Sequence, residues 1–115
     1  MCTKLELTEI LTAFTKDVRE IFGNKLIELI LFGSYARGDY DEESDVDIAI
    51  LADIINGQEH VYYNQLTKLI GDIDEKFGYR VLLSPIIINA KLYEEWKNDL
   101  PFYRNIDREG VKIVA

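Results

Sequence analysis

Cysteine is almost absent from this sequence, and so are the long apolar runs of membrane proteins. Cys2 is the single cysteine among 115 residues, which excludes a disulfide framework and a thiolate metal site within the chain. No apolar run approaches the length of a membrane span, and residues 1–11 carry acidic and polar side chains where a signal peptide needs an apolar core. We therefore expect a cytoplasmic protein that makes no membrane contact.

Basic residues are also scarce. Lys and Arg number 13 against 21 Asp and Glu, and the formal net charge of -8 makes the average surface repel polyanions. This argues against a primary role in coating nucleic acid. The length supplies one apolar core, so we predict a single domain over residues 1–115 whose site borrows surface from a partner protein or from a second copy.

Apolar spacing predicts helices that alternate with strands. In chain order they are expected at residues 5–22 (helix), 25–32 (strand), after 34 (short helix), 45–52 (strand), 60–77 (helix), 79–88 (strand), around 92–96 (helix) and from 101 (helix), before a short apolar tail. Pro85 cannot donate to a strand ladder, so it limits the third strand to a sheet edge or a bulge. The order predicts an α/β or α+β fold with a small mixed sheet flanked by helices.

The segment 31–51 combines residues that suit phosphate chemistry. An apolar strand runs into Gly33-Ser34, and the next strand begins with Asp45-Val46-Asp47. Gly33 lets the backbone turn sharply and lets a phosphate approach closely, while Ser34 offers a hydroxyl at the positive end of a short helix. Gly33-Ser34 alone is more typical of an ordinary strand-to-helix turn with a serine cap, and Asp45-Val46-Asp47 alone is more typical of a solvated strand entry. Together they predict a nucleotide site.

Asp45 and Asp47 are predicted to hold a divalent metal. Residues two apart on a strand lie on the same face with Cα atoms about 6.6 Å apart, so both carboxylates can reach one hard cation. Val46 then faces the core. Without a cation, two neighbouring carboxylates repel each other, which makes the empty site electrostatically unfavourable.

Two polar residues flank this constellation. Arg37 either steadies a phosphate or pairs with Asp39 or Asp41. Ser44 is expected to orient the turn before Asp45 and to lie at the nucleotide. Six aromatic residues are expected in the core or at its edge, and two of them, Trp96 and Tyr103, are also candidates for a partner contact; the six are Tyr62, Tyr63, Tyr93, Trp96, Phe102 and Tyr103.

Gly33-Ser34, ten intervening residues and Asp45-Val46-Asp47 resemble the Gly-Ser...Asp-x-Asp signature of the polymerase-beta-like nucleotidyltransferases. With Ala36-Arg37-Gly38 and its short length, the chain is similar to the minimal nucleotidyltransferases, often paired as antitoxin with a HEPN-domain toxin. The resemblance implies the nucleotidyltransferase fold and transfer of AMP (or another nucleoside monophosphate) from ATP to a protein hydroxyl, a tyrosine of a HEPN-type partner. It implies Mg²⁺ or Mn²⁺ on the catalytic Asp45 and Asp47, and the nucleotide on Gly33, Ser34, Arg37 and Ser44.

The family carries a third carboxylate on the neighbouring strand, and the matching position here is Leu82. A second hypothesis therefore stays open, in which the chain is a weakly active or inactive antitoxin that neutralises its partner by forming a complex. A third hypothesis, nucleotidylation of a small molecule, is less favoured because so short a chain has little beyond its core to build an acceptor pocket.

Overall fold

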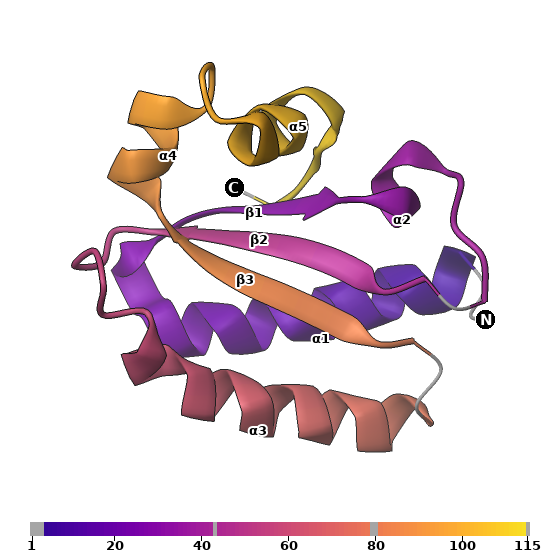
Figure 1. Cartoon of the computed structure of the whole chain (residues 1–115). Coiled ribbons are helices and arrows are strands. Elements are labelled where there is room, and N and C mark those ends of the chain that lie inside the picture. The colour runs from indigo at the N-terminus through magenta and orange to yellow at the C-terminus, as the bar shows by residue number, and fades with distance from the viewer. Residues whose placement is uncertain (1–3, 43, 79–80, 115) are drawn as a thin grey trace.

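In the described residues, which are 4–42, 44–78 and 81–114, a four-stranded mixed sheet forms the centre of the computed structural model (Figure 1). The strands are β1 (Leu26–Phe32), β2 (Val46–Ala52), β3 (Leu83–Asn89) and β4 (Val111–Val114). β1 pairs antiparallel with β2 and with β4, whereas β2 and β3 are parallel, so the order across the sheet is β3-β2-β1-β4. The predicted small mixed sheet is confirmed.

Helices cover both faces of this sheet. They are α1 (Lys4–Phe22), α2 (Ser34–Arg37), α3 (His60–Phe77), α4 (Ala90–Trp96) and α5 (Pro101–Glu109), and the 3-10 turn η1 (Gly23–Lys25) joins α1 to β1. Figure 1 shows α1 and α3 beneath one face, and α4 and α5 above the other. All four of these helices fall where the sequence predicted them, the last of them from Pro101 at its start, and α2 is the short helix expected after Ser34.

The alternation of side chains along β2 builds two cores. Ile48 and Ile50 are fully buried in the larger core, against residues of α1 and α3 such as Phe14. Ala49 and Leu51 point to the other face, where Ile106 of α5 and other buried side chains pack against them. β2 is thus covered on both faces, which explains why nearly all of its side chains are apolar.

The outer edge of β3 offers few free hydrogen-bond donors. β3 lies at the edge of the sheet, as predicted from Pro85, which has no N–H. Two residues further, the N–H of Ile87 donates to the hydroxyl of Tyr63 on α3 at 3.1 Å. The strand begins at Leu83, four residues later than the predicted start at residue 79, and residues 79 and 80 lie outside the described part of the chain.

The apolar tail predicted after Gly110 is in fact a fourth strand. β4 pairs with Leu29–Leu31 of β1 and forms the second edge of the sheet. Four residues are too few to display the alternation that marks a strand, and the pairing partner lies far back in the chain. The sequence pattern therefore carried no signal for this strand.

The aromatic residues divide between the core and the surface. Tyr93 is buried, and Tyr62 and Tyr103 are half-buried, as predicted. The core placement was wrong for Tyr63, Trp96 and Phe102, which are exposed. Aromatic side chains are buried on average, but their composition alone does not tell which of them ends at the surface.

Among the helices of the described residues, none is long and apolar enough to cross a bilayer. The cytoplasmic location stays a prediction, as does the assignment of residues 1–115 to a single domain.

Gly110 generates a stability prediction, because it ends α5 with an ordinary backbone φ of -68° but in a crowded place. A Cβ atom there would lie 2.3 Å from the Ile106 carbonyl oxygen and 2.3 Å from Cγ2 of Ile30. We expect Gly110→Ala to lower the free energy of unfolding by about 1–3 kcal/mol in urea titrations. In the control Gly71→Ala, within α3, nothing lies within 4 Å of the new Cβ, and a gain of about 0.5–1 kcal/mol is expected. Equal effects would contradict the crowding at Gly110.

Candidate active site

The turn after β1 depends on Gly33. Its φ of 73° is in a region that residues with a side chain rarely adopt, and it precedes the single turn of α2. The N–H groups of Ala36 and Arg37 both donate to the Gly33 carbonyl oxygen at 3.1 Å. Because these two N–H groups are already used, an anion at this turn would meet the hydroxyl of Ser34 and the backbone N–H groups that precede Ala36.

Asp47 lies directly against this turn. It is paired across the sheet with Phe32, the residue before Gly33, so its side chain leaves the sheet on the same face as that of Phe32. A Cβ atom on Gly33 would lie 2.3 Å from Oδ2 of Asp47. The carboxylate thus occupies the space of a Cβ atom at position 33, and a larger residue there would have to displace the Asp47 side chain.

Asp45, Asp47 and Arg37 share one electrostatic environment. Asp45 is exposed and lies one residue before β2, whereas Asp47 is half-buried within it. Burial raises the pKa of Asp47, the negative charge of Asp45 raises it further, and the positive charge of Arg37 acts in the opposite direction. The structure therefore brings the two predicted metal ligands and the predicted phosphate contact to one end of the sheet.

Arg37 is held by two carboxylates. Its Nε donates to Oδ2 of Asp39 at 3.2 Å, which is one of the two partners anticipated from the sequence, and its Nη1 pairs with Oε2 of Glu109 at 3.4 Å. The hydrogen bond to Asp39 contributes most to the raised pKa of Arg37. Glu109, at the end of α5, had no sequence signal, because 72 residues separate it from Arg37.

Ser44 closes the acidic loop that leads into Asp45. Its hydroxyl accepts a hydrogen bond from the Asp41 N–H at 2.9 Å and lies 3.2 Å from Oδ1 of the same residue. The predicted role in orienting this turn is confirmed. Its contact with a nucleotide stays a prediction.

The acidic cluster fits a metal site with two protein ligands. The Val46 N–H donates to the Leu82 carbonyl oxygen at 2.8 Å, so Leu82 lies beside Asp45. The parallel register of β2 and β3 places Ser84 beside Asp47. Leu82 is 57% exposed. In the described part of the chain, no group of three or more acidic, His or Cys side chains is placed to hold a cation. Asp45 and Asp47 would therefore hold Mg²⁺ with phosphate oxygens completing its coordination, since Mg²⁺ sites commonly combine one or two carboxylates with substrate phosphates.

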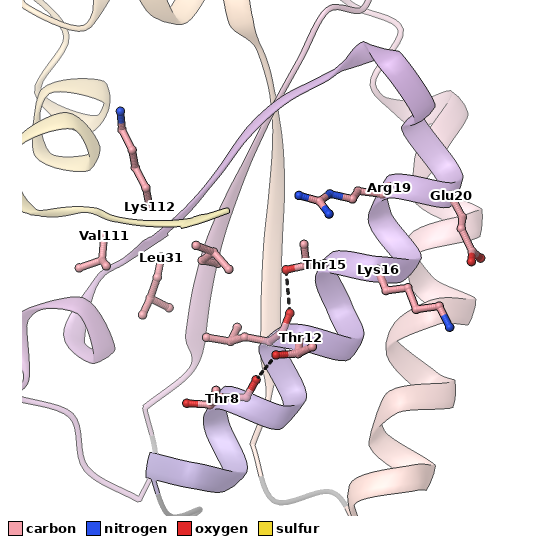
Figure 2. Close-up of a pocket in the computed structure, with 11 residues that line it drawn as sticks. Thr8, Thr12, Thr15, Lys16, Arg19, Glu20, Leu31, Val111 and Lys112 are labelled. Atoms are coloured by element: carbon pink, nitrogen blue, oxygen red, sulfur yellow. Dashed lines mark hydrogen bonds between the residues drawn. The ribbon is translucent and has the colours of Figure 1, made fainter. Parts of the chain in front are cut away.

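A groove of about 600 Å³ lies elsewhere, between α1 and the strands β1 and β4 (Figure 2). The hydroxyls of Thr8, Thr12 and Thr15 along it donate to carbonyl oxygens of their own helix, four residues earlier. Each of these hydroxyls is therefore already engaged within α1. None of the predicted site residues lines it, so we place the candidate active site at the Gly33–Asp47 contact instead.

The comparison with protein families identifies the class of protein. Residues 11–110 match the family model described as "Nucleotidyltransferase domain". The chain belongs to this family and is a nucleotidyltransferase. A protein of Methanocaldococcus jannaschii named "Putative protein adenylyltransferase MJ0141" is 40% identical over 101 residues, which cover 86% of this chain and 96% of that protein.

Two further similarities are shorter or more distant. "Protein adenylyltransferase MntA" of Thermococcus cleftensis is 50% identical over 50 residues, which cover 44% of this chain and 48% of that protein. A solved structure titled "Structure of putative minimal nucleotidyltransferase" is 20% identical, with 90% of this chain and 93% of that one covered and a TM-score of 0.49.

The raised pKa of Asp47 generates a pH-dependent stability prediction. A carboxyl whose pKa is higher in the folded state binds its proton more tightly when folded, so its contribution is present at low pH and is lost as the pH rises above its ordinary value of 3.8. We expect Asp47→Asn to be more stable than the parent at pH 7 by on the order of 0.5 kcal/mol, and no more stable at pH 3. Urea titrations with a chelator present measure this, and Asp72→Asn on the exposed side of α3 controls for the loss of one charge. A gain for Asp47→Asn that is the same at both pH values would contradict the raised pKa.

Proposed function

We propose that this chain transfers AMP from ATP to a hydroxyl group of a protein, in a reaction that depends on Mg²⁺. Membership of the nucleotidyltransferase family and the names of its adenylyltransferase relatives support the proposal. The sequence resemblance to minimal nucleotidyltransferases extends it to a tyrosine of a HEPN-type toxin as acceptor. In that pairing the chain is the antitoxin.

The observation that carries the proposal is the contact between Asp47 and Gly33. In this contact the carboxylate of Asp47, on β2, lies against the turn at Gly33-Ser34 that follows the neighbouring strand β1. Triphosphate oxygens held at Gly33 and Ser34 would therefore lie next to the carboxylates that would hold the cation. This proximity is the geometric requirement of phosphoryl transfer, in which catalysis consists mainly of positioning and charge stabilisation.

Each side chain has a defined part in the proposed reaction. Asp45 and Asp47 hold Mg²⁺, which when bound supplies positive charge to the phosphates and stabilises the transition state. Ser34 donates its hydroxyl hydrogen to a phosphate oxygen, and Arg37 pairs with another. The acceptor oxygen forms a bond to the α-phosphorus while the bond to pyrophosphate breaks. With Leu82 and Ser84 beside the aspartates, the proton of the acceptor hydroxyl passes to solvent or to the partner protein.

A second candidate function is a binding module that neutralises its partner by complex formation. The observation that favours it is the absence of a third carboxylate among the described residues around Asp45 and Asp47. Loss of a positioned general base lowers rates by roughly two to four orders of magnitude, but it leaves two carboxylates able to bind a metal nucleotide. Affinity for ATP therefore does not separate the two functions, whereas covalent modification of the partner does.

Nucleotide binding gives the first test. We expect the double variant Asp45→Asn/Asp47→Asn to lose Mg²⁺-dependent ATP binding in isothermal titration calorimetry, because both proposed metal ligands become neutral. The matched control Asp72→Asn/Asp74→Asn removes two charges at the same spacing from α3, where Asp72 is exposed and Asp74 half-buried, and should bind ATP like the parent. Undiminished binding by the first variant would remove these aspartates from the site.

Intact mass spectrometry gives the second test. The chain is incubated with ATP, Mg²⁺ and a HEPN-type protein encoded beside it. The proposed transferase adds the mass of AMP to that protein, and mapping places the modification on a tyrosine. The Asp45→Asn/Asp47→Asn variant should add none. A stable complex with unchanged partner mass would instead establish the binding module.

A further inference from the structure

Four aromatic rings form a continuous row along the face of the sheet covered by α4 and α5. The ring centroids of Phe32 and Phe102 are 5.7 Å apart, those of Phe102 and Tyr103 are 6.1 Å apart, and those of Tyr103 and Tyr93 are 5.5 Å apart. Tyr93 is buried in the smaller core, and Phe32 and Tyr103 pack against that core. Phe102, by contrast, is 45% exposed. Three rings of the row are therefore buried or half-buried, and the fourth, Phe102, faces solvent.

The exposed ring lies next to the candidate active site. Phe102 meets Phe32 edge to face, with 85° between the ring planes. Phe32 is the residue before Gly33 and is paired across the sheet with Asp47, on the same face. Phe32 therefore contacts the Phe102 ring and is also the cross-strand neighbour of Asp47, whose carboxylate lies against Gly33.

α5 is attached to the site near both of its ends. Phe102 in its first turn contacts Phe32, and Glu109 at its last residue pairs with Arg37 at 3.4 Å. Ile106, between them on the same side of the helix, is buried against the sheet. These contacts hold the helix, and with it the Phe102 ring, in a fixed position relative to Gly33 and Asp47.

We infer that Phe102 is the stacking surface for the purine base of the nucleoside triphosphate whose phosphates bind at Gly33 and Ser34. This inference rests on the proposed function. An aromatic ring accepts a base because both present flat π faces, and stacking of this kind tolerates different bases. A single exposed phenylalanine is ordinary on a protein surface. Its place between Phe32 and Tyr103 in a supported aromatic row, beside the turn at Gly33-Ser34, is what assigns it to the base.

Trp96 provides a matched comparison. It is also an aromatic residue with 45% exposure, but it belongs to α4. Figure 1 shows α4 at the opposite end of the sheet from α2, the helix that begins at the phosphate turn. A general effect of removing an exposed aromatic ring would appear at both positions, whereas an effect on the base should appear at Phe102 alone.

Calorimetry with two ligands separates the base from the phosphates. ATP and inorganic tripolyphosphate are each titrated, with Mg²⁺, into the parent chain and into Phe102→Ala, Phe102→Trp and Trp96→Ala. We expect Phe102→Ala to weaken ATP binding roughly tenfold or more while tripolyphosphate binding stays unchanged. Phe102→Trp should retain ATP affinity because it keeps a π face, and Trp96→Ala should bind both ligands like the parent. Thermal melts of each variant confirm folding.

The outcomes distinguish this inference from the proposed function. If the parent binds ATP and Phe102→Ala binds it equally well, the base lies elsewhere and the proposed function stands. Equal losses for ATP and tripolyphosphate in Phe102→Ala, or an equal loss of ATP affinity in Trp96→Ala, would also overturn the stacking role. If the parent binds neither ligand with Mg²⁺, the proposed function fails and the stacking role fails with it.

Discussion

The candidate site depends on the register between β1 and β2. That register pairs Phe32 with Asp47 and so presses the Asp47 carboxylate against the α-carbon of Gly33. A slip of one residue would turn Asp47 to the face where α1 and α3 form the larger core, and would put a branched apolar side chain beside the turn. The register is fixed by that core, because Ile48 and Ile50 must remain buried on it. Packing on one face of the sheet thus positions the polar groups on the other.

The α5 helix contributes more to the site than its distance in sequence would indicate. Through Glu109 it holds the guanidinium of Arg37, and through Phe102 it extends an aromatic surface to the end of β1 that precedes the turn at Gly33. Both contacts come from the last part of the chain, far from the segment that joins Gly33 to Asp47. A short chain can in this way build the walls of a site from elements whose main task is to cover the sheet.

The features that depend on neighbouring residues in the sequence were predicted correctly. The periods of α1 and α3, the edge position of Pro85 and the turn at Gly33 all follow from spacing or from the chemistry of single residues, and the structure has them in place. β4 and the Arg37–Glu109 pair could not be predicted in the same way, because each joins segments far apart in the chain. The exposure of Phe102 was missed for a related reason, since burial of an aromatic residue is decided by the orientation of its helix on the sheet. The binding roles of the polar site residues remain predictions, because geometry places them together without supplying a ligand.

The outer edge of β3 has a consequence for how this protein meets other chains. An edge strand normally invites an incoming strand to continue the hydrogen-bond ladder, which is a route to fibrous aggregation. Pro85 lacks the donor, and the Ile87 N–H is already taken by the phenol of Tyr63. An incoming strand would find neither donor at two successive outward positions. Addition of a further strand on this side is therefore disfavoured, because it would lack the hydrogen bonds from these two positions.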